Sequence, residues 1–498
     1  MVTTKSLIVA YGLALLPVLV SSSPIVPRYF ERNLFSRDNI TASTVKNELG
    51  QQLSKGSLIF GPDSALYPNA TERWNTRITP DAQVVVQPAA ESDLAQIIKY
   101  CNDNSFEFLV RNREIDVELL TGVTVQPDKK TATLQAGTFI GEVINKLWDQ
   151  GFVTTTGSAA CVGLMGAALG GGHGRYEGLY GLVQDNIVHY NVVLADGTEI
   201  GVNETSHPDL LYALKGAGHN FAIVTSVVGK IYPRENWYQK SYTWTQDKLE
   251  TVFEALNTFH KSANGTTPPR MGASYGSIII NTSISTTEAV LEWGFDYAGP
   301  AADAEKLLRP FNAIKAVQVD SSEASYPIIS GAEDTDCPGA KRAISSVMTL
   351  EYNVTTQRTL YNLFNKKIAE YPGLAPSAYL WHEGYATAGM QAIPSDSTAY
   401  PHREENHLMV FFSEVPEGSG LTDAAEAWAE ENRSLWNAGQ PNRQPQTYVN
   451  YAQGKDYETL QSVYGYEPWR LDKLRSLKAK YDPQNRFRYF EPIVSGSA

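Results

Sequence analysis

Cysteine and basic residues are both scarce in this chain, and each shortage excludes a class of protein. Its 498 residues contain three cysteines, Cys101, Cys161 and Cys337, so at most one disulfide can form and packing must hold the core. No cysteine or histidine spacing resembles a zinc site, and we expect no metal. The net charge of −13 argues against a nucleic-acid partner, because an acidic chain repels phosphate backbones. We expect a monomer with a small-molecule partner.

Long hydrophobic runs are missing except at the start of the chain. Lys5, the apolar run 7–20 and the small residues that follow are typical of a signal peptide cleaved near Ser23. The alternative is a membrane anchor, but the run is too short for a comfortable span and no stop-transfer pattern follows. We therefore expect a secreted protein without membrane attachment after cleavage. Seven Asn-x-Ser/Thr sequons agree with a glycosylated surface: Asn39, Asn69, Asn203, Asn264, Asn281, Asn353 and Asn432.

The remaining sequence predicts an α+β protein in which hydrophobic periodicity changes along the chain. Strands are predicted at 82–87, 106–110, 131–135, 187–194, 199–202, 222–232, 275–283 and 408–412. Helices are predicted at 92–103 with Ser92 as cap, at 140–150 before Gly151, and from Pro468 to Asp482. Asp196-Gly197 predicts a hairpin turn. The parts are 1–22 (signal peptide), 23–79 (lead-in), 80–234 and 235–445 (two α+β domains, the second with an antiparallel sheet) and 446–498 (closing segment).

Glycine is concentrated in the stretch 156–174, TGSAACVGLMGAALGGGHG. Residues without a Cβ let backbone amides approach a ligand closely, and clustered amides suit a pyrophosphate. A flexible or tightly packed loop is the alternative. The spacing is not a Rossmann fingerprint, because Glu177 stands where glycine or alanine is needed, and there is no Walker A lysine motif.

The stretch resembles the second half of the flavin-binding domain of the berberine-bridge-enzyme-like family, whose fold is the vanillyl-alcohol-oxidase or PCMH-type FAD fold. Three further blocks carry the resemblance: Asp185-Asn186 ahead of VVLADG, the segment 216–225 (GAGHNFAIVT), and Asn450-Tyr451 followed by YGYEPWRLDKLRSLKAKYDPQNRF. The resemblance extends from about residue 60 to the end. It implies a two-part PCMH-type FAD-binding domain and an α+β substrate domain with an antiparallel sheet.

The resemblance also implies roles for particular residues. Asn450 and Tyr451 would close over the flavin, and Tyr451 would take the substrate hydroxyl proton as hydride moves to flavin N5, which requires the site to stabilise its phenolate. His382 and Glu383 would line the substrate cavity as further proton-transfer candidates, although each alone is more often structural. The implied FAD contacts are Gly157, Ser158, Val162, Gly163, Gly166, Gly170, Gly174, Ile223, Val224, Asn450 and Tyr451.

Two departures from the family concern covalent attachment of the flavin. Relatives carry a glycine-rich, histidine-containing loop after the strand that ends near Arg111, but here 111–113 runs directly into 114–116. Where bicovalent relatives have cysteine, this chain has Ala159, and we expect Cys161 to be a small buried apolar residue. We therefore predict non-covalent FAD. Val162, at the position that gates oxygen in relatives, favours an oxidase.

These observations predict a secreted FAD-dependent oxidoreductase that moves hydride from an alcohol, sugar or secondary metabolite to the flavin, with molecular oxygen as acceptor. The alternative is a non-catalytic secreted protein of the same fold, in which the missing loop impairs flavin binding. A minor alternative is an esterase with Ser274 as nucleophile, since 272–276 (GASYG) matches G-x-S-x-G. The strand pattern that follows does not suit a nucleophile elbow.

Overall fold

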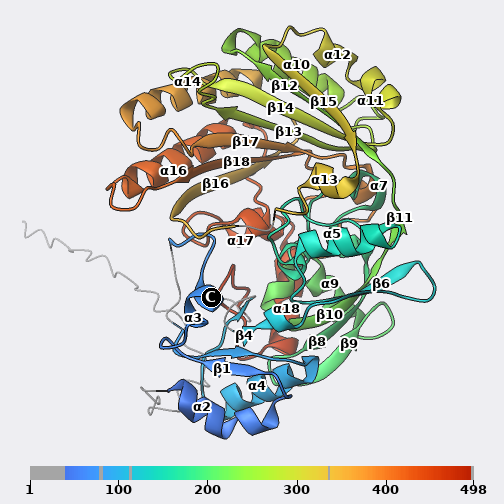
Figure 1. The fold of residues 1–498 in the computed structure, drawn as a ribbon, viewed down its shortest axis with the longest axis vertical. Helices are drawn as coiled ribbons and strands as arrows, with labels where there is room; N and C mark the ends of the chain where they lie inside the picture. The colour runs from blue at the N-terminus through green and yellow to red at the C-terminus, as the bar shows by residue number, and fades with distance from the viewer. Residues whose placement is uncertain (1–39, 78–81, 112–114, 335–336, 495–498) are drawn as a thin grey trace, which may run out of the picture.

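The computed structural model describes residues 40–77, 82–111, 115–334 and 337–494. The predicted signal peptide and Asn39 lie outside these residues. The described chain forms two α+β bodies stacked along the long axis of the molecule (Figure 1).

Two sheets build the body that contains the glycine-rich stretch. The smaller has the order β1 (Leu58–Phe60), β2 (Val85–Gln87), β4 (Ile115–Asp116) and β3 (Val110–Arg111), and the larger has the order β5 (Val123–Val125), β6 (Thr131–Gln135), β10 (Ile223–Lys230), β8 (Ile187–Val193) and β9 (Glu199–Val202). A small antiparallel pair joins β7 (Phe152–Val153) to β11 (Tyr232–Pro233). Strand β10 lies in the middle of the larger sheet, which explains why it is buried along nearly its whole length.

Helices pack their apolar faces on these sheets. Helix α4 (Glu91–Asp103) buries Leu94, Ile97 and Ile98, and α5 (Ile140–Asp149) buries its apolar positions at helical spacing. Helix α9 (Pro208–Ala217) ends at the second glycine-containing block. The remaining short helices here are α2 (Ala42–Glu48), α3 (Tyr67–Thr71), α6 (Leu164–Ala168), α7 (Glu177–Tyr180) and α8 (Val183–Asn186).

The second body is built on one seven-stranded antiparallel sheet. Its order is β15 (Gln318–Ala324), β12 (Trp237–Trp244), β14 (Val290–Ala298), β13 (Met271–Ile279), β17 (Tyr379–Gly384), β18 (His407–Glu414) and β16 (Arg342–Thr349). One core joins this sheet to α10 (Leu249–Phe259), α14 (Val354–Glu370) and α16 (Thr422–Ala438), which cover the face turned away from the other body (Figure 1). The opposite face looks toward the glycine-rich stretch. Shorter helices are α11 (Ala301–Leu307), α12 (Arg309–Asn312), α13 (Tyr326–Ser330) and α15 (Ala388–Gln391).

The last segment returns to the first body through α17 (Leu460–Tyr464) and α18 (Pro468–Tyr481). Helix α18 packs on α9, and Pro468 occupies its first turn as predicted. Its fully buried Lys478 donates hydrogen bonds to the carbonyl oxygens of Asn220 and Phe487, at 2.7 and 2.9 Å, and pairs with Asp482.

Most predicted elements are confirmed, with shifted ends. Strands β6, β8 and β9 and the Asp196-Gly197 turn agree with the prediction, and Gly197 has φ 82°. The prediction for Ser92 is wrong: α4 begins at Glu91, and Asp93 accepts the Ala90 amide at 3.1 Å, so Ser92 lies inside the helix. The strands predicted at 82–87 and 106–110 are reduced to β2 and β3, while β13 begins four residues before the predicted 275.

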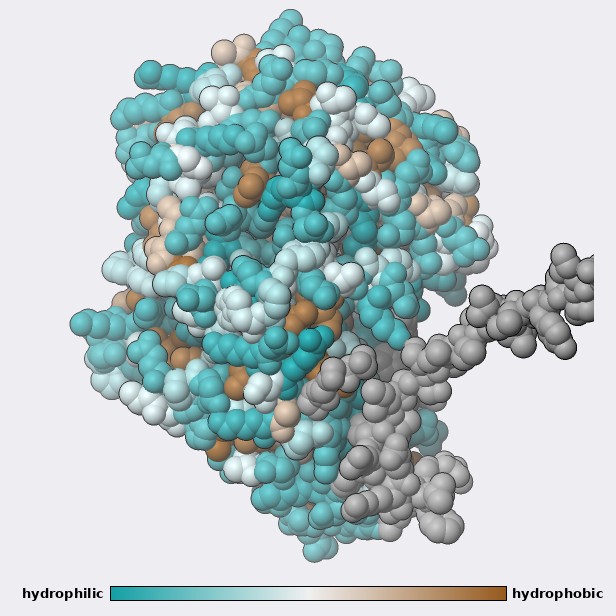
Figure 2. All heavy atoms as spheres, turned by 180° about the vertical axis from the view of Figure 1, so that it is seen from behind, coloured by the Kyte–Doolittle hydropathy of each residue, from teal (hydrophilic) through white to brown (hydrophobic). Residues whose placement is uncertain are grey.

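The surface bears on the predicted glycosylation. Hydrophilic residues cover most of the face shown in Figure 2, and hydrophobic ones are scattered in small groups. Within the described ranges, no helix is long and apolar enough to cross a membrane. Asn432 is fully buried in α16, where its amide donates to the Trp428 carbonyl oxygen at 2.9 Å, so a glycan there does not fit the folded chain and that prediction is corrected. Asn69, Asn264 and Asn353 are exposed.

Candidate functional site

The glycine-rich stretch is buried along most of its length but leaves one strip of small residues uncovered. Residues 170–178 are buried, whereas Ala159, Val162 and Gly166 are exposed. Val162 is 40% exposed, which is unusual for a valine, and a Cβ added to Gly166 would contact nothing. This uncovered strip is the surface that a flat ligand could occupy.

Two glycines of the stretch are required by close packing. A Cβ at Gly174 would overlap the Thr156 carbonyl oxygen, and one at Gly170 would overlap the side-chain oxygen of Asn450. Since these neighbours are backbone or tightly held side chain, neither position accepts another residue. The predicted positions Gly157 and Gly163 lie earlier in the stretch, on either side of the turn at 160–161, and Gly163 is the N-cap residue of α6.

The closing segment lies directly against this stretch. The Asn450 amide donates to the Ala167 carbonyl oxygen at 2.9 Å and to the Tyr448 hydroxyl oxygen at 2.7 Å. That hydroxyl oxygen in turn accepts the Gly172 amide at 3.0 Å. Residues nearly three hundred positions apart are thus brought together, and Asn450 lies against the glycine stretch. The contact of Asn450 and Tyr451 with the flavin stays a prediction.

The second glycine-containing block also packs on the first. The Leu169 carbonyl oxygen accepts the amides of Gly216, at 3.2 Å, and Gly218, at 3.1 Å. Gly216 has φ 119°, a conformation that favours glycine, and a Cβ there would overlap the Tyr400 backbone. The strand that follows, β10, buries Ile223 and Val224, so their side chains are not accessible to a ligand in the described fold.

A buried carboxylate, Glu383, forms the polar centre of the facing sheet. One oxygen accepts hydrogen bonds from the Tyr451 hydroxyl and the Trp381 indole, both at 2.9 Å, and the other accepts from the Tyr385 hydroxyl at 3.0 Å. A second set of hydroxyls links this centre to the glycine stretch. The Ser158 hydroxyl shares hydrogen bonds with Tyr275, at 2.6 Å, and Tyr385, at 2.9 Å.

Burial sets the protonation behaviour of this centre. It raises the pKa of Glu383 above its ordinary value, although the hydrogen bonds from Tyr451, Tyr385 and Trp381 oppose the shift. Burial, followed by the neighbouring Glu383 charge, raises the pKa of Tyr451 well above its ordinary value. We had expected the site to stabilise a Tyr451 phenolate, but these surroundings do the opposite. The Tyr451 hydroxyl instead donates its proton in a hydrogen bond to Glu383, a carboxylate whose pKa is raised.

His382 does not belong to this centre. Successive side chains of a strand point to opposite faces, so His382 points away from the face that carries Glu383. It is fully buried beneath α10, near Phe253 and Trp293, and shares a 2.9 Å hydrogen bond with Gln357. The prediction of a catalytic role for His382 is therefore corrected to a role in the core.

The esterase alternative is also excluded by position. Ser274 lies inside β13, fully buried, and its hydroxyl oxygen accepts the Trp293 indole N–H at 2.8 Å. A nucleophile elbow requires an exposed serine on a sharp turn between a strand and a helix.

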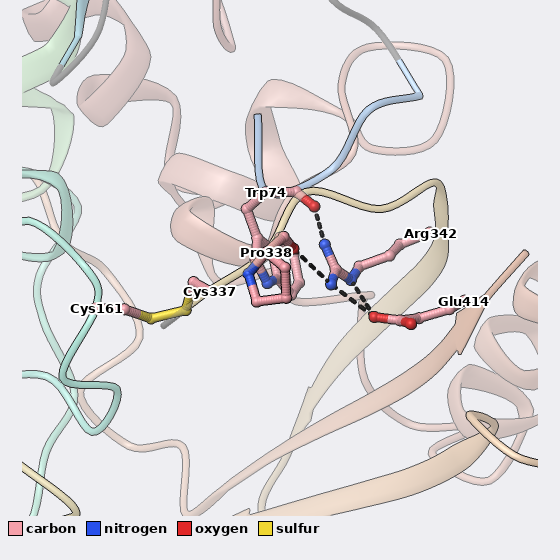
Figure 3. The surroundings of a disulfide bond; sticks show 6 residues. All are labelled: Trp74, Cys161, Cys337, Pro338, Arg342 and Glu414. Atoms are coloured by element: carbon pink, nitrogen blue, oxygen red, sulfur yellow. Dashed lines mark hydrogen bonds and ion pairs between the residues drawn. A yellow bond between two sulfur atoms is a disulfide. The ribbon is translucent and has the colours of Figure 1, made fainter. Parts of the chain in front are cut away.

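Cys161 is not the isolated apolar residue that we expected. It forms a disulfide with Cys337, 176 residues further along the chain, and so joins the glycine stretch to the second body (Figure 3). Sequence alone left open which cysteines pair, because three cysteines allow several pairings. Cys101 is the free cysteine.

The connection where relatives carry a histidine-containing loop is very short here. Strands β3 and β4 are parallel neighbours, with Val110 opposite Ile115 and Arg111 opposite Asp116, and only residues 112–114 separate them in sequence. Parallel neighbours ordinarily need a crossover of a dozen residues or more. Among the described residues we assign no histidine to flavin attachment.

The residues present fit a flavin in part. The uncovered strip over Val162 and Gly166 suits a flat ring system, and hydrogen bonds through Tyr385 and Ser158 connect Glu383 to the same stretch. Tyr275 and Trp381 were not predicted as site residues. The alternation of Trp381 and Glu383 along one strand face was the signal that could have identified Trp381.

Known proteins resemble the chain along its whole length. A family model described as an FAD binding domain matches residues 112–203. The FAD-linked oxidoreductase iacH of Pestalotiopsis fici is 70% identical, with all of both chains covered, and the FAD-linked oxidoreductase anuG of Penicillium roqueforti is 45% identical over 93% of this chain and 94% of its own. The iacH alignment runs over 512 positions, more than the 498 residues of this chain, so iacH has residues where this chain has none.

Solved structures agree at the level of the fold. The BBE-like 1 protein of Physcomitrella patens superposes with a TM-score of 0.79 at 19% identity, covering 92% of this chain and all of that one. A chitooligosaccharide oxidase superposes with a TM-score of 0.77 at 19% identity, covering 91% of this chain and all of that one. With the contacts between the glycine stretch and the closing segment, these similarities show that the chain belongs to the berberine-bridge-enzyme-like family of FAD-linked oxidoreductases, with a PCMH-type FAD-binding fold.

Proposed function

We propose that the chain is a secreted oxidase that holds FAD non-covalently and removes hydride from an alcohol group. The observation that carries the proposal is the Tyr451–Glu383 hydrogen bond, which the hydroxyls of Tyr385 and Ser158 link to the glycine stretch. When bound, FAD supplies the hydride acceptor. The protein's own residues must then bind the substrate and take up the hydroxyl proton.

Tyr451 and Glu383 are suited to move that proton as a pair. The Tyr451 hydroxyl donates to Glu383, so it can take the substrate proton on its oxygen while giving its own proton to the carboxylate. Burial raises the pKa of Glu383, which makes the carboxylate a stronger proton acceptor. This relay avoids the costly free phenolate that burial opposes at Tyr451.

The face around Glu383 supports a substrate with rings. Phe412, Tyr379, Trp381 and Tyr275 are half-buried neighbours on one face of the sheet, with successive ring centroids 5.0, 6.2 and 5.6 Å apart. We name this set the aromatic row. Aromatic rings stack on flat apolar groups and on the apolar faces of sugars. We propose a ring-bearing alcohol, from a secondary metabolite or a sugar, as the substrate class.

Non-covalent FAD and oxygen as acceptor complete the proposal. The three-residue connection between β3 and β4 leaves no room for an attachment loop, and Ala159 cannot form a thioether. The proposed FAD contacts are Ser158, Val162, Gly163, Gly166, Asn450 and Tyr451, which are at least partly exposed. The other expected contacts, Gly157, Gly170, Gly174, Ile223 and Val224, are buried in the described fold. The exposed Val162 leaves a path for oxygen, and the Cys161–Cys337 disulfide agrees with secretion.

The shortened connection also supports the second candidate, a non-catalytic protein of the same fold. The visible spectrum of protein purified from a secreting host, with and without added FAD, separates the two. We expect a yellow protein that releases its flavin into solution when the protein is precipitated with acid. In the intact protein, a ring-bearing alcohol should bleach the flavin under anaerobic conditions. In air, the same alcohol should lead to hydrogen peroxide. A colourless protein that takes up no FAD supports the non-catalytic candidate instead.

A further inference from the structure

Residues 337–342, which we call the strap, run from the disulfide to the start of β16. Cys337 ties one end of the strap to Cys161 on the glycine stretch. Along its length the strap pairs with the segment 72–76: the Ala340 amide donates to the Trp74 carbonyl oxygen at 3.1 Å, and its own carbonyl oxygen accepts the Thr76 amide at 2.9 Å. The disulfide therefore fixes the position of Trp74 as well as that of the strap (Figure 3).

The Trp74 ring is held in place although it is 41% exposed. The Arg342 guanidinium lies 4.5 Å from the Trp74 ring centroid and donates a hydrogen bond to the Trp74 carbonyl oxygen. Arg342 is buried and bonds Glu414 at 2.6 Å, so the cation cannot swing away from the ring (Figure 3). An exposed tryptophan fixed by a buried arginine is a prepared contact surface rather than a loose side chain.

Trp74 stands at one end of the aromatic row. Its ring centroid lies 5.4 Å from that of Phe412, which stacks on Tyr379 at 5.0 Å. The row continues to Trp381, whose indole donates to Glu383. Trp74 and Glu383 thus mark opposite ends of one surface, with three rings between them.

We propose that Trp74 forms the far wall of the substrate site and sets the length of substrate that the site accepts, and that the Cys161–Cys337 disulfide holds this wall in register with the glycine stretch. The inference rests on the proposed function, because it takes the aromatic row as the substrate surface. A ring-bearing alcohol with its hydroxyl at Tyr451, beside Glu383, lies along the row, and its far end meets the Trp74 ring.

The test compares a short and a long uncharged alcohol, benzyl alcohol and 4-(benzyloxy)benzyl alcohol. Dissociation constants are measured by calorimetry on the full chain for the wild type, Trp74→Ala, Trp74→Phe and Trp469→Ala. Trp469 is a matched control, because it is 40% exposed and stacks on Arg470 away from the row. We expect Trp74→Ala to shift the long-to-short affinity ratio by about tenfold, the size of a lost or gained apolar contact at a pocket wall.

Trp74→Phe should restore the wild-type ratio, because it keeps a ring at the wall, and Trp469→Ala should leave it unchanged. Cys337→Ser should shift the ratio in the same direction as Trp74→Ala, since the strap is then anchored at one end only. An unchanged ratio in Trp74→Ala, with both alcohols still bound, overturns the inference and leaves the proposed function standing.

FAD uptake, followed by quenching of flavin fluorescence, distinguishes failure of the proposed function from failure of the inference about Trp74. Trp74 does not contact the glycine stretch in the described structure, so Trp74→Ala should bind FAD as the wild type does. A wild type that takes up no FAD contradicts the proposed function, while the affinity ratio is still read on the flavin-free protein. A wild type that binds neither alcohol also contradicts the inference that Trp74 forms the far wall of the substrate site.

Discussion

Asp185 and Arg403 form a buried two-pronged ion pair between the two bodies of the molecule. The guanidinium donates two hydrogen bonds to the carboxylate, both at 2.9 Å, and the two side chains are 2% and 3% exposed. Asp185 lies in α8 beside the glycine stretch, and Arg403 precedes β18 of the seven-stranded sheet. The pair fixes the flavin-binding fold against the sheet that carries Glu383.

Removing one partner of this pair should destabilise the protein strongly. Asp185→Asn leaves the Arg403 charge buried without its counter-ion, and such a loss costs about 3–5 kcal/mol. The measurement is the free energy of unfolding in urea. Asp303→Asn is the control: Asp303 pairs with Lys306 on the surface, where an ion pair contributes about 0–1 kcal/mol. Equal losses of unfolding free energy in the two variants would show that the buried pair contributes no more to stability than the surface pair does.

Loss of either member of the Tyr451–Glu383 pair should slow anaerobic flavin reduction while FAD stays bound. For Tyr451→Phe and Glu383→Gln we expect a loss of about 10²–10⁴-fold, the usual contribution of a positioned proton acceptor. The rate is followed by stopped-flow bleaching of the flavin band. Tyr466→Phe is the control, since Tyr466 is 36% exposed and its hydroxyl bonds the Pro445 carbonyl oxygen. Reduction at the wild-type rate in Glu383→Gln would remove the carboxylate from the proton path.

The same reaction should depend on pH through Glu383. Only the ionised carboxylate can accept the phenol proton, and burial raises the pKa of Glu383 above the ordinary value of 4.5. The reduction rate should therefore rise as the pH increases through this raised pKa and level off above it. In Glu383→Gln the same limb of the profile should be flat. A limb that persists in this variant would assign the titration to another group.

Acid should destabilise the protein through its buried histidines. Burial lowers the pKa of His260 and His382 to about 3, whereas the ordinary value is 6.5. Below pH 6.5 the unfolded chain therefore takes up protons that the folded chain does not, so the free energy of unfolding falls as the pH decreases from about 6.5 toward 3.

Urea unfolding at several pH values measures how far the free energy of unfolding falls, and His260→Gln should make this fall smaller. The exposed His207→Gln is the control and should keep the wild-type slope. A wild-type stability that does not change between pH 7 and pH 4 would contradict the prediction.

Local patterns in the sequence were enough for many elements, but not for the contacts that make the site. Ile140, Val143, Ile144 and Leu147 predicted α5 because helical spacing places them on one face. The strand predicted at 106–110 is nearly absent, because the apolar residue Phe108 packs on Phe487 from the closing segment instead of pairing along a sheet.

The centre of the site depends on contacts between distant residues. Ser158 bonds Tyr275, 117 residues away, and Cys161 bonds Cys337, 176 residues away. Periodicity within a short segment of sequence cannot predict such pairings, because they depend on how the two bodies pack. The family resemblance offered Tyr451 and Glu383 as candidates, and the structure places them in a 2.9 Å hydrogen bond. It also offered His382, which strand alternation alone assigns to the other face.

The position of α18 has a consequence for how the protein is made. Lys478, near the end of the chain, is fully buried against the Asn220 carbonyl oxygen, and the disulfide needs residue 337 before Cys161 can be oxidised. The first body therefore cannot be completed before helix α18 has been synthesised. Its buried surfaces stay open until then, so a chain cut before α18 should not close its N-terminal half.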